Sequence, residues 1–144
     1  MRPASQVLYA DRARPRRSLP ARPLYYGMLM FAQAARRALV PARLASNSGD
    51  LQAFATHASD GILRICLINK GPRGGARVRI DPQRAFTAAS LVRLSVPAVD
   101  ATAGITPGGS SVDELGAWAP AVREVVALTG AELALDLPPR APPC

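Results

Sequence analysis

The sequence predicts an all-β fold: an antiparallel β-sandwich preceded by one apolar α-helix and by a disordered, arginine-rich N-terminal arm. Residues 1–43 hold nine arginines and one aspartate, whereas residues 44–144 balance nine basic residues with nine acidic ones. From residue 44 onward, short apolar runs alternate with turn residues, which is typical of β-rich folds. A chain of 144 residues has room for a single domain with its own core.

The arm, residues 1–22, combines six arginines and three prolines with little apolar periodicity, which predicts disorder. Two interpretations stay open: a salt-sensitive contact with nucleic acid or another polyanion, or a tail without a partner. Arginine supplies all but one of the 18 basic residues, as a GC-rich gene would also produce. The net charge of +8 therefore does not by itself predict nucleic-acid binding.

The first regular element is predicted to be a helix over residues 23–38. Pro23 suits the first helical position. Four apolar residues recur at helical spacing on one face: Leu24, Met28, Phe31 and Ala35. Charge enters only at Arg36 and Arg37, which we place at the C-terminal end of the helix dipole. A helix that is apolar on nearly every side needs cover from more than one direction.

Residues 51–58 and 62–70 are predicted to pair as a hairpin, because Asp60-Gly61 between them is a strong turn signal. Apolar residues lie on both faces of the second run: Leu63, Ile65 and Leu67 on one, Ile62, Cys66 and Ile68 on the other. We therefore expect the second strand to be central or nearly central in its sheet, with Cys66 as a small core residue.

The rest of the predicted sandwich, which spans residues 44–139, consists of shorter elements. Residues 76–80 alternate arginine with apolar residues, which predicts a strand with one wet face. Residues 90–96 are predicted to form another strand, and the turn-rich residues 97–120 admit only short ones. Residues 122–128 fit a strand or a helix, residues 131–138 alternate leucine as a strand does, and residues 140–144 form a tail.

Four blocks stand in order along the chain: PLYYGMLMFAQA, DGILRICLINKG, VRLSVPAVDATAGITPGGSSVDELGAW and LDLPP. Their order and spacing resemble the C-terminal β-domain of glycoside hydrolase family 79, the β-glucuronidase and heparanase type. In that family, the helix equivalent to residues 23–37 is the last helix of a (β/α)8 barrel, and the strands after it form a sandwich packed against that barrel. The resemblance implies a non-catalytic accessory domain. Without a visible signal peptide we expect the cytoplasm by default, or secretion if the domain is part of a longer exported enzyme.

Catalysis is not expected, and neither a cofactor nor a metal is implied. In the family that the chain resembles, two barrel glutamates cleave uronic-acid glycosides, and no position here matches either of them. Three glutamates are predicted to be surface charges: Glu114, Glu124 and Glu132. His57, the single histidine, has no nucleophile or carboxylate at triad spacing, so we expect a hydrogen-bonded structural residue. Cys66 and Cys144 do not form a metal-ligand pattern.

Two alternatives to the accessory domain remain. A free-standing sandwich could bind acidic glycans, since guanidinium groups suit carboxylate and sulfate and an indole face suits a sugar ring. The candidate residues are Arg64, Arg77, Arg79, Arg93 and Trp118. The other alternative is a non-specific polyanion or nucleic-acid contact through the arm.

Two expectations concern edges and membranes. The strand that follows the Pro-Pro turn in the family, and the one that its N-terminus contributes, have no counterpart here, so open sheet edges are predicted. The apolar stretch at residues 23–35 is too short to span a bilayer, and no secretory signal is visible before it.

Overall fold

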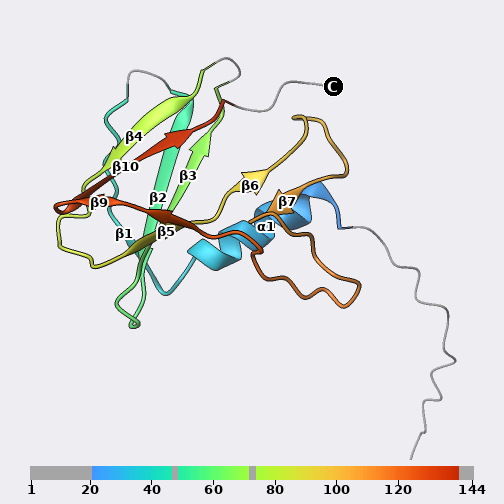
Figure 1. The fold of residues 1–144 in the computed structure, drawn as a ribbon, viewed down its shortest axis with the longest axis horizontal. Coiled ribbons are helices and arrows are strands. Elements are labelled where there is room, and N and C mark those ends of the chain that lie inside the picture. Colours follow the sequence, from blue (N-terminus) through green and yellow to red (C-terminus); the bar gives the residue numbers. More distant parts are fainter. Residues whose placement is uncertain (1–20, 47–48, 72–73, 140–144) are drawn as a thin grey trace, which may run out of the picture.

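The structure is a computed structural model of the chain and describes residues 21–46, 49–71 and 74–139. Apart from residues 21–22, the predicted arm lies outside these ranges, as does the tail at residues 140–144. Within them, one helix is followed by short strands that pair antiparallel in several small sheets (Figure 1). The largely β fold with a preceding helix is as predicted. The elements are α1 (Pro23–Ala34), β1 (Ala38–Val40), β2 (Leu51–His57), β3 (Leu63–Asn69), β4 (Ala76–Ile80), β5 (Ala89–Leu91), β6 (Leu94–Ser95), β7 (Thr106–Pro107), β8 (Glu124–Val126), β9 (Leu128–Thr129) and β10 (Glu132–Leu137).

Helix α1 begins at Pro23, where a missing N–H costs no helical hydrogen bond, and contacts β3 and β7 (Figure 1). It ends at Ala34, earlier than the predicted boundary at residue 38. Arg36 and Arg37 therefore lie beyond the last helical turn, and their predicted place at its dipole is wrong. The reason is a tertiary contact: the hydroxyl of Thr56 donates to the carbonyl of Ala34 and accepts from the N–H of Arg36.

The predicted hairpin is confirmed as β2 and β3, which pair in register with Phe54 opposite Cys66 and Thr56 opposite Arg64. Gly61 in the turn has a φ of +76°, a conformation that glycine adopts without strain. The sheet order is β1-β2-β3, so β2 is central and β3 lies at an edge, contrary to expectation. Apolar residues on both faces of β3 predict that other parts of the chain pack above and below the sheet. Such packing does not require a hydrogen-bonded strand on both sides of β3.

The second three-stranded sheet has the order β4-β10-β9. Arg77 and Arg79 point to its exposed face, and Val78 is buried on the other, which confirms the predicted wet and dry sides of residues 76–80. Leu135 of β10 lies opposite Val78 in register. Asn69, at the end of β3, donates from its side-chain amide to the carbonyl of Pro138 at 2.8 Å and so connects the two sheets.

The strand predicted at residues 90–96 is divided into β5 and β6. Strand β5 pairs with β8, whereas β6 pairs with β7, so the chain changes partner at Val92 and Arg93. Residues 122–128, which fitted either type of element, contain β8 and the start of β9. Few side chains of the described ranges are fully or nearly fully buried: Tyr26, Ala55, Thr56, Val78, Ala98, Ile105 and Pro107.

Candidate functional site

An apolar stripe of α1 faces solvent. Leu24, Met28 and Phe31, on the face predicted from helical spacing, are 75%, 62% and 66% exposed. We call these three residues the α1 outer face. The opposite side of the helix holds it to the domain, where Tyr26 is buried. An apolar stripe at this spacing usually packs against other protein, so its exposure marks a surface that lacks its cover.

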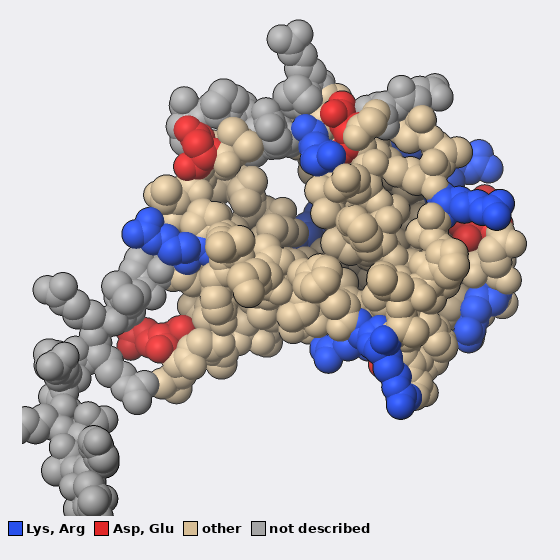
Figure 2. Space-filling view, turned by 180° about the vertical axis from the view of Figure 1, so that it is seen from behind, with Lys and Arg blue, Asp and Glu red and all other residues tan. Residues whose placement is uncertain are grey.

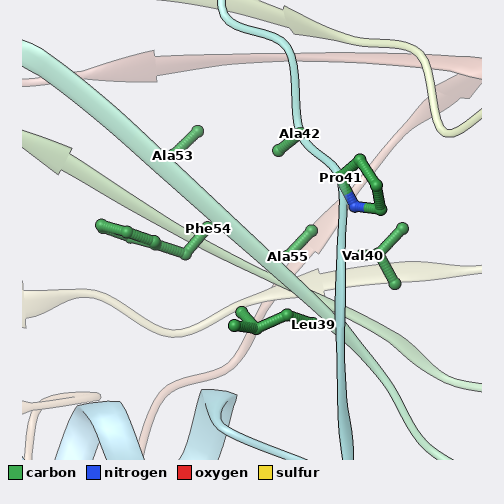
Figure 3. Close-up of a pocket in the computed structure, with 7 residues that line it drawn as sticks. All are labelled: Leu39, Val40, Pro41, Ala42, Ala53, Phe54 and Ala55. Atoms are coloured by element: carbon green, nitrogen blue, oxygen red, sulfur yellow. The ribbon is translucent and has the colours of Figure 1, made fainter.

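A second exposed apolar region lies between β1 and β2. Residues Leu39, Val40, Pro41, Ala42, Ala53, Phe54 and Ala55 line an open hollow of about 370 Å³ (Figure 3). Leu39 is 78% exposed and Phe54 is 48% exposed. The side chains of these two residues point to the same side, and that of Val40 points to the other (Figure 3). The hollow is therefore wide, apolar and open to solvent.

The hollow borders the end of α1. Leu39 lies opposite Thr56 in the β1-β2 register, and Phe54 is two residues along the same strand, so all three side chains share one face of the sheet. The hydroxyl of Thr56 binds the last helical residue, Ala34. The α1 outer face, Leu39 and Phe54 together are called the apolar surface below.

The predicted glycan-binding arginines do not form a cationic cluster. Arg64 forms an ion pair with Asp60 at the turn of the hairpin, at 2.7 Å. Along the second sheet, Arg79 lies 3.6 Å from Glu132, and Arg77 is opposite Asp136 in register. Arg93 lies 2.7 Å from Glu124. Acidic side chains thus alternate with these arginines, which leaves little positive potential to attract an anionic polysaccharide.

The Asp60–Arg64 pair has the clearest electrostatic effect in the described ranges. Hydrogen bonds from the Arg64 guanidinium and then from the Ile62 N–H stabilise the charged carboxylate. They lower the pKa of Asp60 from 3.8 to about 2. Because the pair is exposed and internally matched, it rigidifies the hairpin rather than forming a reactive centre.

Trp118 is half-buried, and its indole N–H donates to the carbonyl of Pro107 at 3.0 Å. This bond fixes the ring against β7, whose Pro107 is fully buried. Tyr25 and Tyr26 of α1 pack against each other edge to face.

The remaining chemical candidates lie apart from one another. Glu124 and Glu132 are engaged by Arg93 and Arg79, and Glu114 is exposed. The Nε2 atom of His57 is buried without a hydrogen-bond partner in the described residues, which differs from the hydrogen-bonded histidine we expected. In the same ranges, no three His, Cys, Asp or Glu side chains gather as metal ligands.

Cys66 is half-buried opposite Phe54, and burial raises the pKa of its thiol. A raised pKa lowers the fraction of thiolate, the nucleophilic form, so Cys66 is not an activated nucleophile. Cys144 lies outside the described residues.

Sequence reasoning missed Leu39 and Phe54 as surface residues. The run Ala38-Leu39-Val40 lies at the end of the predicted helix and before the predicted sandwich, although its apolar and β-branched residues are a short strand signal. Without β1, the hollow that it forms with β2 was not predictable.

The chain matches no protein-family model and no curated protein. No helix of the described ranges is both long enough and apolar enough to cross a bilayer.

Proposed function

We propose that this chain is a non-catalytic accessory β-domain that packs through the α1 outer face against a (β/α)8 catalytic barrel carried by residues outside this sequence. In this proposal the β-strands form a sandwich, and the domain resembles the C-terminal domain of β-glucuronidase-type glycoside hydrolases. Its role is to stabilise the barrel or to border its substrate cleft.

The exposure of Leu24, Met28 and Phe31 carries the proposal. The helix sequence PLYYGMLMFAQA contains no charged residue. Its outward side therefore exposes a mainly apolar surface to water, which is unfavourable. Burying an apolar side chain of this size contributes roughly 1.5–3 kcal/mol. A protein surface that covers all three would therefore gain enough to hold the two domains together.

The residues that would carry catalysis in such an enzyme belong to the barrel in this proposal. Glu124 and Glu132 each bind an arginine of this domain, which supports a structural role for them. Glycan binding by the four predicted arginines is the weaker candidate, because each of them lies beside a carboxylate.

The test begins with the DNA that flanks the coding sequence, searched for a barrel with two candidate glutamates. The barrel is expressed alone and together with this chain, and both samples are assayed with an aryl β-glucuronide and by gel filtration. We expect the chain alone to hydrolyse nothing above buffer, and the two polypeptides to elute together. Leu24→Glu should weaken their association at least ~10-fold.

Leu115→Glu is the matched control, because Leu115 is 85% exposed but lies in the loop between β7 and β8. It should leave association unchanged. Equal behaviour of the Leu24 and Leu115 variants, hydrolysis by the purified chain, or failure of any neighbouring barrel to bind it would each contradict the proposal.

A further inference from the structure

We propose that the partner of the apolar surface is a protein face whose apolar centre is bordered by Asp or Glu carboxylates. The inference rests on the proposed function for the location of the surface and adds the chemistry of what covers it. Its basis is the distribution of charge around α1 and β1, the lack of ion-pair partners for that charge among the described residues, and the shape of the hollow.

The segment that forms most of the apolar surface has only positive charge. Residues 21–46 contain no aspartate or glutamate, but they include Arg36, Arg37 and Arg43, all exposed. Arg36 and Arg37 connect the end of α1 to β1, and Arg43 follows directly after the hollow-lining residues that end at Ala42. The three arginines, called the basic rim below, thus flank the apolar surface along the chain.

The basic rim differs from three arginines that have an acidic partner within the domain. Arg64, Arg79 and Arg93 each have a carboxylate within ion-pair distance. In the described ranges no carboxylate forms an ion pair with a rim arginine. On the face shown in Figure 2, charged side chains lie mainly near the outline, and the middle is uncharged. The guanidinium groups of the three rim arginines are exposed and are therefore accessible to carboxylates of a partner.

The charge distribution distinguishes between three possible partners of the apolar surface: a second copy of the chain, an anionic lipid surface and another protein. A second copy of the chain would bring its own basic rim and apolar segment, with no carboxylate in residues 21–46 to meet the arginines. An anionic lipid surface would satisfy the arginines, but it is fluid and flat, whereas the hollow between β1 and β2 is concave and can hold a side chain. A protein face with a protruding apolar side chain and acidic flanks satisfies both features.

The basic rim should act mainly on specificity and on the salt dependence of binding. Exposed ion pairs each change affinity only a few-fold and are screened by salt, while the apolar centre supplies most of the affinity. Loss of the rim is therefore expected to weaken binding of an acidic partner and to improve binding of a basic one.

The experiment uses the intact chain and two fluorescein-labelled model helices with the same leucine stripe. One helix has glutamates beside the stripe, and the other has lysines. Binding is followed by fluorescence anisotropy at low salt and at about 1 M salt, where the Debye length is about 3 Å. We expect the glutamate helix to bind about 10-fold more tightly than the lysine helix at low salt, and most of that difference to vanish at high salt.

Two double variants with the same change in net charge distinguish a local effect of the basic rim from the long-range attraction of the whole domain's charge. Arg36→Glu with Arg37→Glu should abolish or reverse the preference for the glutamate helix. Arg77→Glu with Arg79→Glu, on the exposed face of β4, should preserve at least half of it. Circular dichroism spectra of both variants check that the fold is intact.

Each other result overturns the inference in an identifiable way. Equal binding of the two helices, or equal effects of the two double variants, would show that the rim does not select carboxylates. Absence of binding by either helix would also reject it, while the barrel assay decides the proposed function separately. Stronger binding to phosphatidylglycerol vesicles than to the glutamate helix, lost in Leu24→Glu, would assign the surface to a membrane. Self-association that Leu24→Glu abolishes would assign it to a second copy.

Discussion

Arg93 and Glu124 form a two-point ion pair although 31 residues separate them along the chain. The Nε and Nη2 groups of Arg93 donate to the two carboxylate oxygens at 2.7 and 3.3 Å. The remaining Nη1 group donates to the backbone carbonyl of Asp136 at 2.9 Å. One side chain in the connection between β5 and β6 therefore binds β8 and β10 at once.

Replacing Arg93 by alanine should destabilise the domain. The variant loses three hydrogen bonds, but the two side chains of the pair are 33% and 42% exposed, so water replaces part of what is lost. We expect the free energy of unfolding to fall by about 1–2 kcal/mol, measured by urea denaturation. Arg77→Ala, on the open face of β4, should change it by less than about 0.5 kcal/mol. Equal losses in the two variants would mean that the pair contributes nothing specific.

Gly108 marks a place where the backbone approaches other residues closely. Its φ is +57°, and a Cβ there would lie 2.6 Å from the Cβ of Pro120 and 3.1 Å from Cγ1 of Val92. Gly108→Ala should therefore cost about 2–4 kcal/mol, from the left-handed backbone and from overpacking.

Gly116 supplies the matched control, because its φ is +82° but nothing lies within 4 Å of the position of a Cβ. Gly116→Ala should cost only the backbone term, about 1–2 kcal/mol. Urea denaturation of both variants gives the difference. A Gly108 variant no less stable than the Gly116 variant would show that Pro120 moves aside freely.

The carboxyl of Asp60 should titrate unusually low. Hydrogen bonds from Arg64 and then from the Ile62 N–H hold its pKa at about 2, below the ordinary 3.8. A depressed folded-state pKa stabilises the folded protein above about pH 4, and this contribution is lost as the pH falls toward 2. Carboxyl-carbon NMR should show the titration directly in the wild type.

Arg64→Gln tests the assigned cause. The variant removes the guanidinium but retains the N–H of Ile62, so the pKa of Asp60 should rise toward 3.8 without necessarily reaching it. The difference in thermal unfolding midpoint between wild type and Asp60→Asn should be visible near pH 5 and small near pH 2. An unchanged pKa in Arg64→Gln would show that the salt bridge is not populated in solution.

Short sequence patterns predicted those parts of the fold that are determined by residues close together in the sequence. The β2-β3 hairpin followed from Asp60-Gly61 and two apolar runs of similar length, and β10 followed from alternating leucines. The end of α1 and the division of residues 90–96 were not predictable, because distant partners determine them. Thr56 binds the end of the helix, and two different strands, β8 and β7, pair with β5 and β6.

The apolar surface, too, was only partly predictable from the sequence. Helical spacing placed Leu24, Met28 and Phe31 on one face, but a periodic pattern cannot tell whether that face is covered. The charge excess of residues 1–43 was plain from composition. Which arginines have internal partners became visible only from the register, since Arg77 and Arg79 meet β10 residues that lie 59 and 55 positions later.

The late partner of β4 has a consequence for synthesis. Strand β4 pairs with β10, whose first residue emerges about 50 residues after Ile80. At a translation rate of roughly 5–20 residues per second, β4 waits several seconds on the ribosome for its partner. During that time Val78 is exposed on an unpaired strand, flanked by Arg77 and Arg79, whose like charges discourage pairing with the same strand of another nascent chain. The two arginines thus protect the chain before the fold that buries Val78 exists.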